Sequence, residues 1–361
     1  MKRMIIISLC VLYFSLFFVL SPSKTNAEPS VDFWIESIDP NWESEVFHTL
    51  PFPTAAISFD SEDNLYVSDL MNNWGPGIRN IFRFASPEYD EPSIYLSYET
   101  AYEGINGMDF DRKENLFVSE FMGKDPPGFD VGAIRKIYAR THQVSEPIEF
   151  IFPDGDFRPT GIAVTGFGTI YFPGRKHSVP EWGNIYKIES FENYDPITGP
   201  TVYKEDAIRT AIAIDEWENM YAGISYYSAL DFERNSIYTI NPYTKEVVKI
   251  ATFNQYVEEL AFDSNGNLHA LEGAEGDPST IIKLMPPYIS IDGCDTGIID
   301  WSLPDGSTIS EIIESCEDMA FDHGQFVSCV VNHIIELKND GLISSRQMSA
   351  IVSCAAQTDI P

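Results

Sequence analysis

Residues 260–271 read LAFDSNGNLHAL, in which two short apolar runs flank a polar turn from Asp263 to Asn267. Alternating apolar residues on both sides of a short turn are typical of a β-hairpin. Further copies of this pattern occur upstream, at residues 55–70, 107–121, 161–175 and 211–225. The copies start about 50 residues apart, which is a period typical of propeller blades.

The residues at the two ends of each turn have a local structural role. An Asp stands four residues before an Asn in every copy except the third, which has Thr165 and Thr169 instead. Short side chains of this kind bond backbone groups of the turn and tolerate left-handed backbone conformations. An EF-hand calcium loop would need carboxylates at alternate positions and a distal Glu, and the turns lack that pattern. We therefore interpret the turns as structural.

Two more strand candidates follow each of the first four copies, so each repeat has the four strands of one blade. The fold class predicted is all-β, a β-propeller of five clear four-stranded repeats. The outermost strand of the fifth repeat is either Tyr288–Ile291 or the N-terminal run Glu45–Thr49, which would close the ring. A degenerate sixth blade is left open, either from residues 31–50 with the segment after 285, or around the strand-like Asp318–Asp322.

Residues 1–27 are typical of a secretory signal peptide. Lys2 and Arg3 precede an apolar run that ends at Leu20, and the small residue Ala27 marks the expected cleavage point. The alternative is an uncleaved membrane anchor, although a membrane-spanning helix usually needs about 20 apolar residues. The sequence thus predicts a signal peptide over 1–27, a propeller over 28–291, and a secreted or periplasmic location.

The mature chain is strongly acidic. The sequence has 23 Lys and Arg against 55 Asp and Glu, and cleavage after Ala27 removes three basic residues, which leaves a formal charge near −35. Such a surface repels phosphate backbones and anionic lipids. We therefore expect no nucleic acid and no anionic membrane as partner, but a small-molecule or protein ligand. The sequence does not indicate the oligomeric state.

Residues 292–361 differ in composition and contain all the cysteines of the mature chain: Cys294, Cys316, Cys329 and Cys354. An even number of cysteines in a secreted chain predicts two disulfides, and no closely spaced pair of the zinc type occurs. Apolar residues at helical spacing after Gly324 predict one helix, and a capping box of Ser344 and Gln347 predicts a second. In this α-helical hairpin Cys329 and Cys354 would lie level and pair, which would leave Cys294 with Cys316.

The connections between strands indicate which face of the propeller binds. The turns inside the hairpins are short, whereas the connections after each hairpin are long and rich in Gly, Pro and aromatic residues. Long loops on one face of a rigid scaffold are usually built for binding. The candidate ligand-binding residues on that face are Trp74, His177, Trp182, Arg209, Tyr226 and Tyr227.

The residues that precede the innermost strands should form a ring around the mouth of the central channel. Aligned on the turns, these are Ala55, Asn106, Thr160, Thr210 and Glu258. Asn106, Glu258 and Glu259 supply the hard oxygen ligands that calcium takes, so they form the candidate metal site. Three further carboxyls, Asp69, Glu120 and Glu272, stand where the second strand of a hairpin ends. We expect these carboxyls to accept hydrogen bonds from loop amides. The alternative is that they support the metal ligands without contacting the metal.

The ring and the repeated motif, FDSEDNLYV at Phe59–Val67, resemble the gluconolactonase and regucalcin-like propellers, and also the NHL-repeat and streptogramin-lyase propellers. The resemblance covers residues 45–291. For a lactonase it implies a channel Asn in an Asn-Gly pair, which Asn106 matches, and a channel acid on a later blade, which Glu258 matches in chemistry. The Glu that these lactonases have on the first blade is replaced by Ala55, and the channel His of the lyases has no counterpart.

The C-terminal segment resembles a small cysteine-containing module at the C-termini of secreted bacterial proteins, which implies no activity. Two functions then remain. The first is a secreted, non-catalytic propeller that binds a ligand or protein on its long-loop face. The second is a calcium-dependent hydrolase of the lactonase type, with the metal in the central channel. Whether the chain is an enzyme is left open, and no catalytic residue is identified.

Overall fold

The structure is a computed structural model of the chain. It describes residues 35–69, 77–100, 104–122, 131–150, 157–176, 183–195, 199–204, 211–224, 235–241, 245, 247–273, 278–300, 303 and 307–358. The expected signal peptide, residues 1–27, lies outside these ranges.

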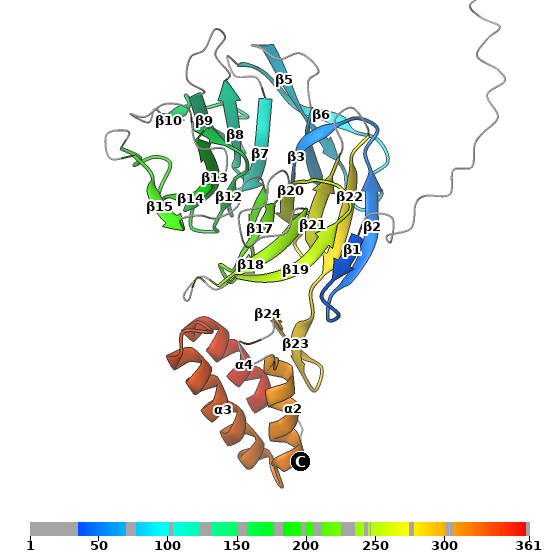
Figure 1. The fold of residues 1–361 in the computed structure, drawn as a ribbon, viewed down its shortest axis with the longest axis vertical. Coiled ribbons are helices and arrows are strands. Elements are labelled where there is room, and N and C mark those ends of the chain that lie inside the picture. The colour runs from blue at the N-terminus through cyan, green and yellow to red at the C-terminus, as the bar shows by residue number, and fades with distance from the viewer. Residues whose placement is uncertain are drawn as a thin grey trace, which may run out of the picture. The chain divides into compact units, whose positions relative to one another are not determined.

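Five antiparallel sheets form the five blades of a propeller, as the repeats predict (Figure 1). Blade 1 contains β3 (Thr54–Phe59), β4 (Leu65–Asp69), β5 (Gly77–Phe84) and β6 (Ser93–Thr100). Blade 2 contains β7 (Gly104–Phe110), β8 (Leu116–Met122), β9 (Val131–Ile137) and β10 (Ile148–Phe150). Blade 3 contains β11 (Phe157–Pro159), β12 (Ala163–Val164), β13 (Ile170–Lys176), β14 (Gly183–Ile188) and β15 (Thr201–Lys204).

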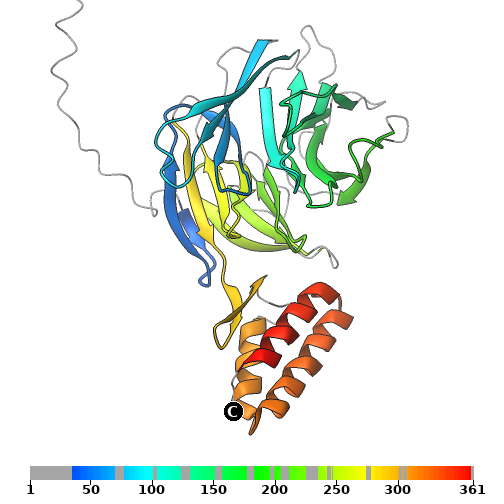
Figure 2. The ribbon, with the colours of Figure 1, turned by 180° about the vertical axis from the view of Figure 1, so that it is seen from behind.

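Blades 4 and 5 each recruit a strand from the N-terminal part of the chain. Blade 4 contains β16 (Ala211–Ile214), β17 (Met220–Ile224), β18 (Ser236–Ile240) and β19 (Val247–Phe253), and β1 (Ile35–Ile38) pairs with β19. Blade 5 contains β20 (Val257–Phe262), β21 (Leu268–Glu272) and β22 (Thr280–Met285), and β2 (Glu43–Thr49) pairs with β22. Figure 2 shows the blue N-terminal strands beside the yellow strand β22. The N-terminal run therefore closes the ring, and Tyr288–Ile291 is not part of blade 5.

The first turn of each blade has the structure that the repeat predicts. In four blades the Asp Oδ1 accepts hydrogen bonds from the backbone N–H groups two and four residues later, at 2.8–3.0 Å. The Asn side chain donates to the other carboxylate oxygen at 2.7–2.8 Å. The residue before the Asn has a positive φ in these blades, and so does its counterpart in blade 3, Gly168. The Asp and Asn therefore satisfy the turn's own backbone.

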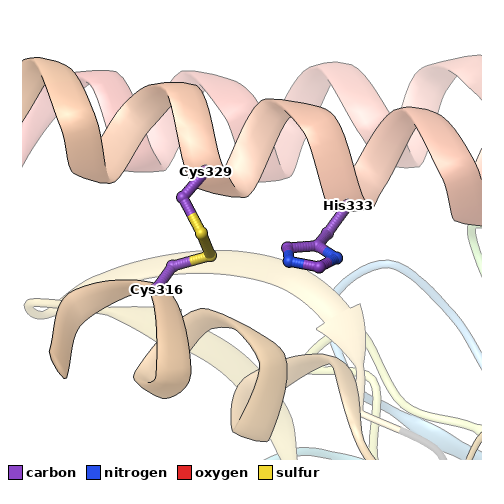
Figure 3. Close-up of side chains that lie close together, drawn as sticks. All are labelled: Cys316, Cys329 and His333. Carbon is purple, nitrogen blue, oxygen red and sulfur yellow. A yellow bond between two sulfur atoms is a disulfide. The ribbon is translucent and has the colours of Figure 1, made fainter. Parts of the chain in front are cut away.

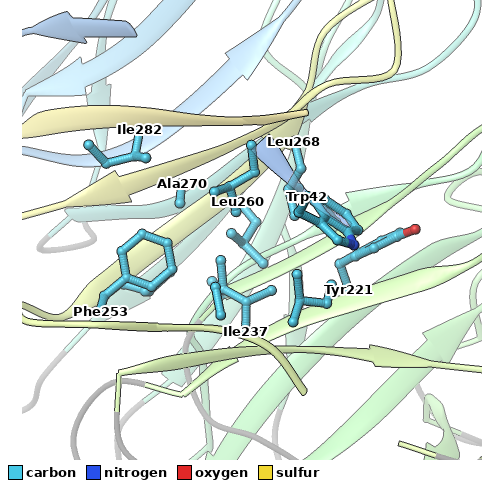
Figure 4. Packing of buried hydrophobic residues seen from close by; sticks show 14 of the residues in the cluster. Trp42, Tyr221, Ile237, Phe253, Leu260, Leu268, Ala270 and Ile282 are labelled. Carbon is cyan, nitrogen blue, oxygen red and sulfur yellow. The ribbon is translucent and has the colours of Figure 1, made fainter. Parts of the chain in front are cut away.

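Apolar clusters lie between neighbouring blades, one for each of the five junctions. The cluster between blades 4 and 5 includes Tyr221, Phe253, Leu260 and Ile282 (Figure 4). Trp42, from the segment between β1 and β2, joins this cluster, with its ring 6.3 Å from that of Tyr221. Burial of alternate strand residues between sheets is the main stabilising contribution in such a fold.

A separate apolar core lies in the C-terminal part of the chain. It combines a hairpin of β23 (Tyr288–Ile291) and β24 (Cys294–Ile299) with the helices α2 (Ile309–Met319), α3 (His323–Asn339) and α4 (Ser345–Gln357). The two predicted helices are α3 and α4, and Ser344 with Gln347 forms the predicted capping box. The hairpin spans the predicted domain boundary between residues 291 and 292. We call residues 288–358 the helical module.

The helix α2 was not predicted, although its capping box of Thr308 and Glu311 is visible in the sequence. It includes Asp318 and Met319, and Asp322 is the N-cap of α3, so the segment Asp318–Asp322 is no blade strand. Among the described residues no helix is long and apolar enough to cross a membrane.

Two disulfides join the parts of the helical module, and the predicted pairing was wrong. Cys316 bonds to Cys329, and Cys294 bonds to Cys354. The predicted pairing compared only α3 and α4. Because α2 packs against α3, Cys316 reaches Cys329 (Figure 3), and because β24 packs against α4, Cys294 reaches Cys354. Two disulfides of this kind are typical of proteins that fold in an oxidising compartment.

Candidate functional site

The two faces of the propeller differ in their connections. Five residues separate the first and second strands in every blade, for example Asp60–Asn64 between β3 and β4. Between the second and third strands the separation varies from six residues in blade 3 to eleven in blade 4. We call these two sides the turn face and the loop face. The predicted ligand-binding residues of the loop face all lie outside the described ranges: Trp74, His177, Trp182, Arg209, Tyr226 and Tyr227.

Among the predicted ring residues, the structure brings Asn106 close to Thr160, whereas no described contact joins Ala55 or Glu258 to them and Thr210 lies outside the described ranges. Asn106 on β7 donates its side-chain N–H to the Pro159 carbonyl of blade 3 at 2.9 Å. Thr160 follows that carbonyl, and its hydroxyl has no hydrogen-bond partner among the described atoms. The ring position of blade 1, Ala55, supplies no polar group. Asn106 therefore already ties blade 2 to blade 3.

Glu259 extends across the centre of the propeller. A Cβ placed on Gly107 would lie 2.7 Å from the Glu259 Oε2, so this blade 5 side chain reaches β7, next to Asn106. The same Cβ would lie 2.6 Å from the Gly161 Cα of blade 3. Only glycine permits this close approach of backbone and carboxyl. Of the three predicted metal ligands, the structure thus brings Glu259 to the neighbourhood of Asn106.

The Glu259 carboxyl is buried, and burial favours its neutral form. Its side chain has no exposed surface, Oε1 accepts a hydrogen bond from the Leu260 N–H at 3.1 Å, and Oε2 has no partner among the described atoms. Burial raises the pKa of Glu259 well above its ordinary value, and the nearby Asp109 carboxyl raises it further. The opposing backbone amides of Leu260 and Ile212 do not reverse this shift.

Asp109 is a second carboxyl at the centre, and the ring alignment missed it. Its Oδ2 accepts the Val164 N–H of blade 3 at 2.6 Å, and its Oδ1 accepts the Phe110 N–H at 2.9 Å. Burial raises the pKa of Asp109 to about 7. A signal existed in the sequence, because the aligned positions in the other blades hold small residues: Ser58, Ala163, Ala213 and Ala261. Glu259 likewise stands where the other blades have Ala56, Gly107, Gly161 and Ala211.

The central residues do not fit a calcium site as they stand. Calcium needs six to eight oxygen ligands, whereas among the described residues Asp109 uses both carboxyl oxygens for backbone N–H groups and Glu259 uses one. Among the described residues, the only three His, Cys, Asp or Glu ligand atoms that lie within 4.8 Å of one another belong to Cys316, Cys329 and His333. That group is no metal site either, since its two sulfurs form a disulfide (Figure 3). We therefore derive no metal-dependent step.

The carboxyls at the ends of the second strands have three different environments. Asp69 accepts hydrogen bonds from the backbone and side chain of Asn80 on β5, at 3.2 and 2.7 Å. Glu120 pairs with Arg135 on β9 at 2.7 Å and accepts the Tyr98 hydroxyl at 2.9 Å. Glu272 is fully buried with no hydrogen-bonded side chain among the described residues, and burial raises its pKa to about 9. Within the described part of the chain, Asp69 and Glu120 thus bind residues of neighbouring strands, whereas the loops that follow them lie outside it.

No protein-family model matches the sequence. No curated protein matches it either.

Solved structures with a similar fold include several that are named as enzymes of sugar chemistry. The soluble aldose sugar dehydrogenase from Escherichia coli is 10% identical, with a TM-score of 0.42 over 68% of this chain and 99% of that one. A gluconolactonase from Xanthomonas campestris is 8% identical, with a TM-score of 0.43 over 70% and 92%. A calcium structure of a carbohydrate-active enzyme from Trichoderma reesei is 12% identical, with a TM-score of 0.39 over 69% and 96%. With such scores the likeness carries no argument about what this chain does.

Proposed function

We propose that the chain is a secreted or periplasmic, non-catalytic propeller that binds a neutral ligand or a protein through its loop face. The observation that carries this proposal is the contrast between the faces. Five-residue turns of one construction recur on the turn face, whereas the loop-face connections differ in length from blade to blade. A turn that recurs in the same form in every blade stabilises the scaffold, whereas loops of variable length on a rigid scaffold are typical of binding surfaces.

The composition of these loops supports a ligand with flat apolar surfaces. They contain Trp74, Trp182, Tyr226 and Tyr227, whose rings offer large contact areas at a small cost in conformational entropy. The strongly negative charge of the chain disfavours anionic ligands. Neutral saccharides have both properties, an apolar ring face and no charge, and they serve as the probes.

The test is a titration of the chain with neutral mono- and disaccharides, followed by intrinsic tryptophan fluorescence and thermal melting. Binding should raise the melting temperature. The double variant Trp74→Ala with Trp182→Ala should bind the saccharide about tenfold more weakly, or weaker still. The matched control is Trp217→Ala, on the turn face, which should leave the affinity unchanged. Failure of every saccharide to bind, or binding that survives both loop substitutions, would reject this proposal.

The lactonase-type alternative rests on one observation, the unpartnered Glu259 Oε2 beside Gly107. A melt with calcium and with a chelator separates the two proposals, because an ion held at the centre raises the melting temperature by mass action. We expect no shift. A shift that Glu259→Gln abolishes, together with lactone hydrolysis by the wild-type chain, would favour the hydrolase.

A further inference from the structure

A cavity of about 300 Å³ lies on the turn face. It is formed by the first turns of blades 4 and 5 and by the β23–β24 hairpin of the helical module. The lining residues that matter for its chemistry are Asp215, Trp217, Asp263, Gly266, Tyr288 and Asp295. This volume is in the lower range of small-molecule sites. The cavity is distinct from the loop face and from the centre of the propeller.

The cavity lining is acidic. Four carboxyl groups line it, those of Asp215, Glu216, Asp263 and Asp295, and the lining contains no Lys, Arg or His. Behind the lining, Arg346 lies 3.7 Å from the Glu216 carboxylate, His269 lies 3.1 Å from the Asp263 carboxylate, and burial raises the pKa of Asp215 to about 7. The Tyr288 hydroxyl reports this charge, because after burial the same four carboxyls are what raise its pKa. Asp295 is the most available of them, since its side chain is exposed and only its Oδ1 accepts a backbone N–H, from Gly297 at 2.8 Å. A cation is therefore the favoured occupant.

Aromatic rings form the other part of the lining. Trp217 donates its indole N–H to the Gly297 carbonyl at 2.6 Å, which fixes the ring against the hairpin. The Arg346 guanidinium lies 4.4 Å from the centroid of this ring, so a cation already contacts the indole within the chain. Tyr288 and Phe262 add further apolar surface. Aromatic faces beside carboxylates are the groups that recognise organic ammonium ions.

The walls of the cavity are built before any ligand arrives. Asp63, from the turn of blade 1, accepts hydrogen bonds from the Ser264 N–H and hydroxyl at 2.7 and 2.9 Å, which holds the blade 5 turn in place. The Tyr288 hydroxyl donates to the Asn265 carbonyl at 3.2 Å and lies against Gly266. A preformed site loses little conformational entropy on binding.

A buried hydroxyl behind the cavity wall, close to Asp215, lacks a partner among the described atoms. Tyr221 is fully buried, and its hydroxyl has no hydrogen-bond partner among the described atoms. After burial, Asp215 and then Tyr288 raise its pKa, so the hydroxyl lies near both residues. Figure 4 shows this oxygen pointing away from the apolar cluster. Tyr221 does not line the cavity itself, so its hydroxyl adds a polar group behind the wall and not a ligand contact.

We propose that the turn-face cavity binds a small organic cation that carries an ammonium group, with its charge near Asp295 and its apolar surface against Trp217 and Tyr288. A divalent metal is not favoured, because among the described residues no three of the acidic ligand atoms here lie within 4.8 Å of one another. Organic cations need no such cage, because one carboxylate and an aromatic face suffice.

The test is calorimetric titration of the full chain with choline, tetramethylammonium and butylammonium, and with 3,3-dimethyl-1-butanol as the uncharged isostere of choline. At least one ammonium compound should bind, and the isostere should bind about tenfold more weakly or not at all. Asp295→Asn should weaken ammonium binding about tenfold. Its amide oxygen can still accept the Gly297 N–H, so an unchanged melting temperature would show that the hairpin is intact.

The controls distinguish this site from the loop face. Trp74→Ala should not change ammonium affinity, and Trp217→Ala should reduce it. The proposal is overturned if none of the three ammonium compounds binds, if choline and its isostere bind alike, or if the Asp295→Asn chain, folded as the wild type, keeps full affinity.

Discussion

At the scale of single residues, equivalent positions of the repeat have different chemistry because their neighbours differ. Glu120 and Glu272 hold the same place in the second strand of a blade, nine residues after the Asp that opens the turn. Burial raises the pKa of both carboxyls, but the Arg135 guanidinium beside Glu120 opposes this effect, whereas Glu272 has no cation within its described hydrogen bonds or ion pairs. A buried carboxyl without a cation is more stable in its neutral form, which is why burial raises the Glu272 pKa to about 9.

This difference predicts a pH dependence. The unfolded pKa of a Glu is about 4.3, so the stabilisation from neutral Glu272 is fully present below about pH 4 and is lost as the pH rises through its folded value of about 9. The wild-type free energy of unfolding should therefore fall by up to about 1.4 kcal/mol per pH unit over this range. The side chain that Glu272→Gln introduces is neutral at every pH, so the variant should lack this part of the fall. Denaturant unfolding at a series of pH values measures the slope of each chain.

The matched control is Glu120→Gln, at the same place in blade 2. It leaves the buried Arg135 guanidinium without its carboxylate, so it should lower the free energy of unfolding by about 3–5 kcal/mol at neutral pH. At pH 9 the two substitutions should thus have opposite signs. Equal slopes for the wild type and Glu272→Gln would show that Glu272 is ionised in the folded chain.

At the scale of elements, the first turn of each blade is one construction used five times. Its fourth residue has a positive φ in every copy, yet it is Asp63, Glu114 and Glu218 in three blades and glycine in the other two. The left-handed conformation therefore does not by itself require glycine. Gly266 differs because a Cβ there would lie 2.1 Å from the Tyr288 hydroxyl, whereas a Cβ on Gly168 would meet nothing within 4 Å.

Two alanine substitutions separate backbone strain from this close contact. Gly168→Ala should cost about 1 kcal/mol, from the left-handed backbone alone. Gly266→Ala should cost about 1–3 kcal/mol more, because the β23–β24 hairpin must move away from the turn. Denaturant midpoints of the two variants give the comparison. In a Tyr288→Phe background the extra cost should shrink, and its persistence would contradict the contact.

At the scale of the molecule, the ring and the helical module are closed by contacts between distant parts of the chain. β2 pairs with β22 across more than 200 residues, which satisfies the outer edge of blade 5. In the module, the Cys294–Cys354 disulfide spans 60 residues and Cys316–Cys329 spans 13. Such cross-links stabilise mainly by restricting the unfolded chain, and a longer loop restricts it more.

Removal of the two disulfides should therefore have unequal effects. Cys294→Ser with Cys354→Ser should lower the stability of the module by about 4 kcal/mol, and Cys316→Ser with Cys329→Ser by about 3 kcal/mol. Denaturant unfolding of both double variants measures the order. Peptide mapping under non-reducing conditions checks the pairing first, and a Cys329–Cys354 peptide would contradict the structure.

The sequence by itself determined the blades, their turns and two helices, because these depend on short-range physics. Alternating apolar residues define strands, and the Asp and Asn of each turn bond to backbone groups within four residues. The ring alignment made Glu258 the equivalent of Asn106, whereas the side chain that the structure brings to the neighbourhood of Asn106 is that of the next residue, Glu259. The start of helix α2 could also have been predicted from the sequence, because Thr308 and Glu311 form a capping box.

Only the tertiary structure decided what depends on packing between distant segments. The choice of β2 over Tyr288–Ile291 as the closing strand, and the disulfide pairing, require knowledge of which elements lie side by side. The same holds for the raised pKa of Glu259 and for the turn-face cavity, whose walls come from three parts of the chain. Burial and charge proximity arise only after folding, so no local pattern contains them.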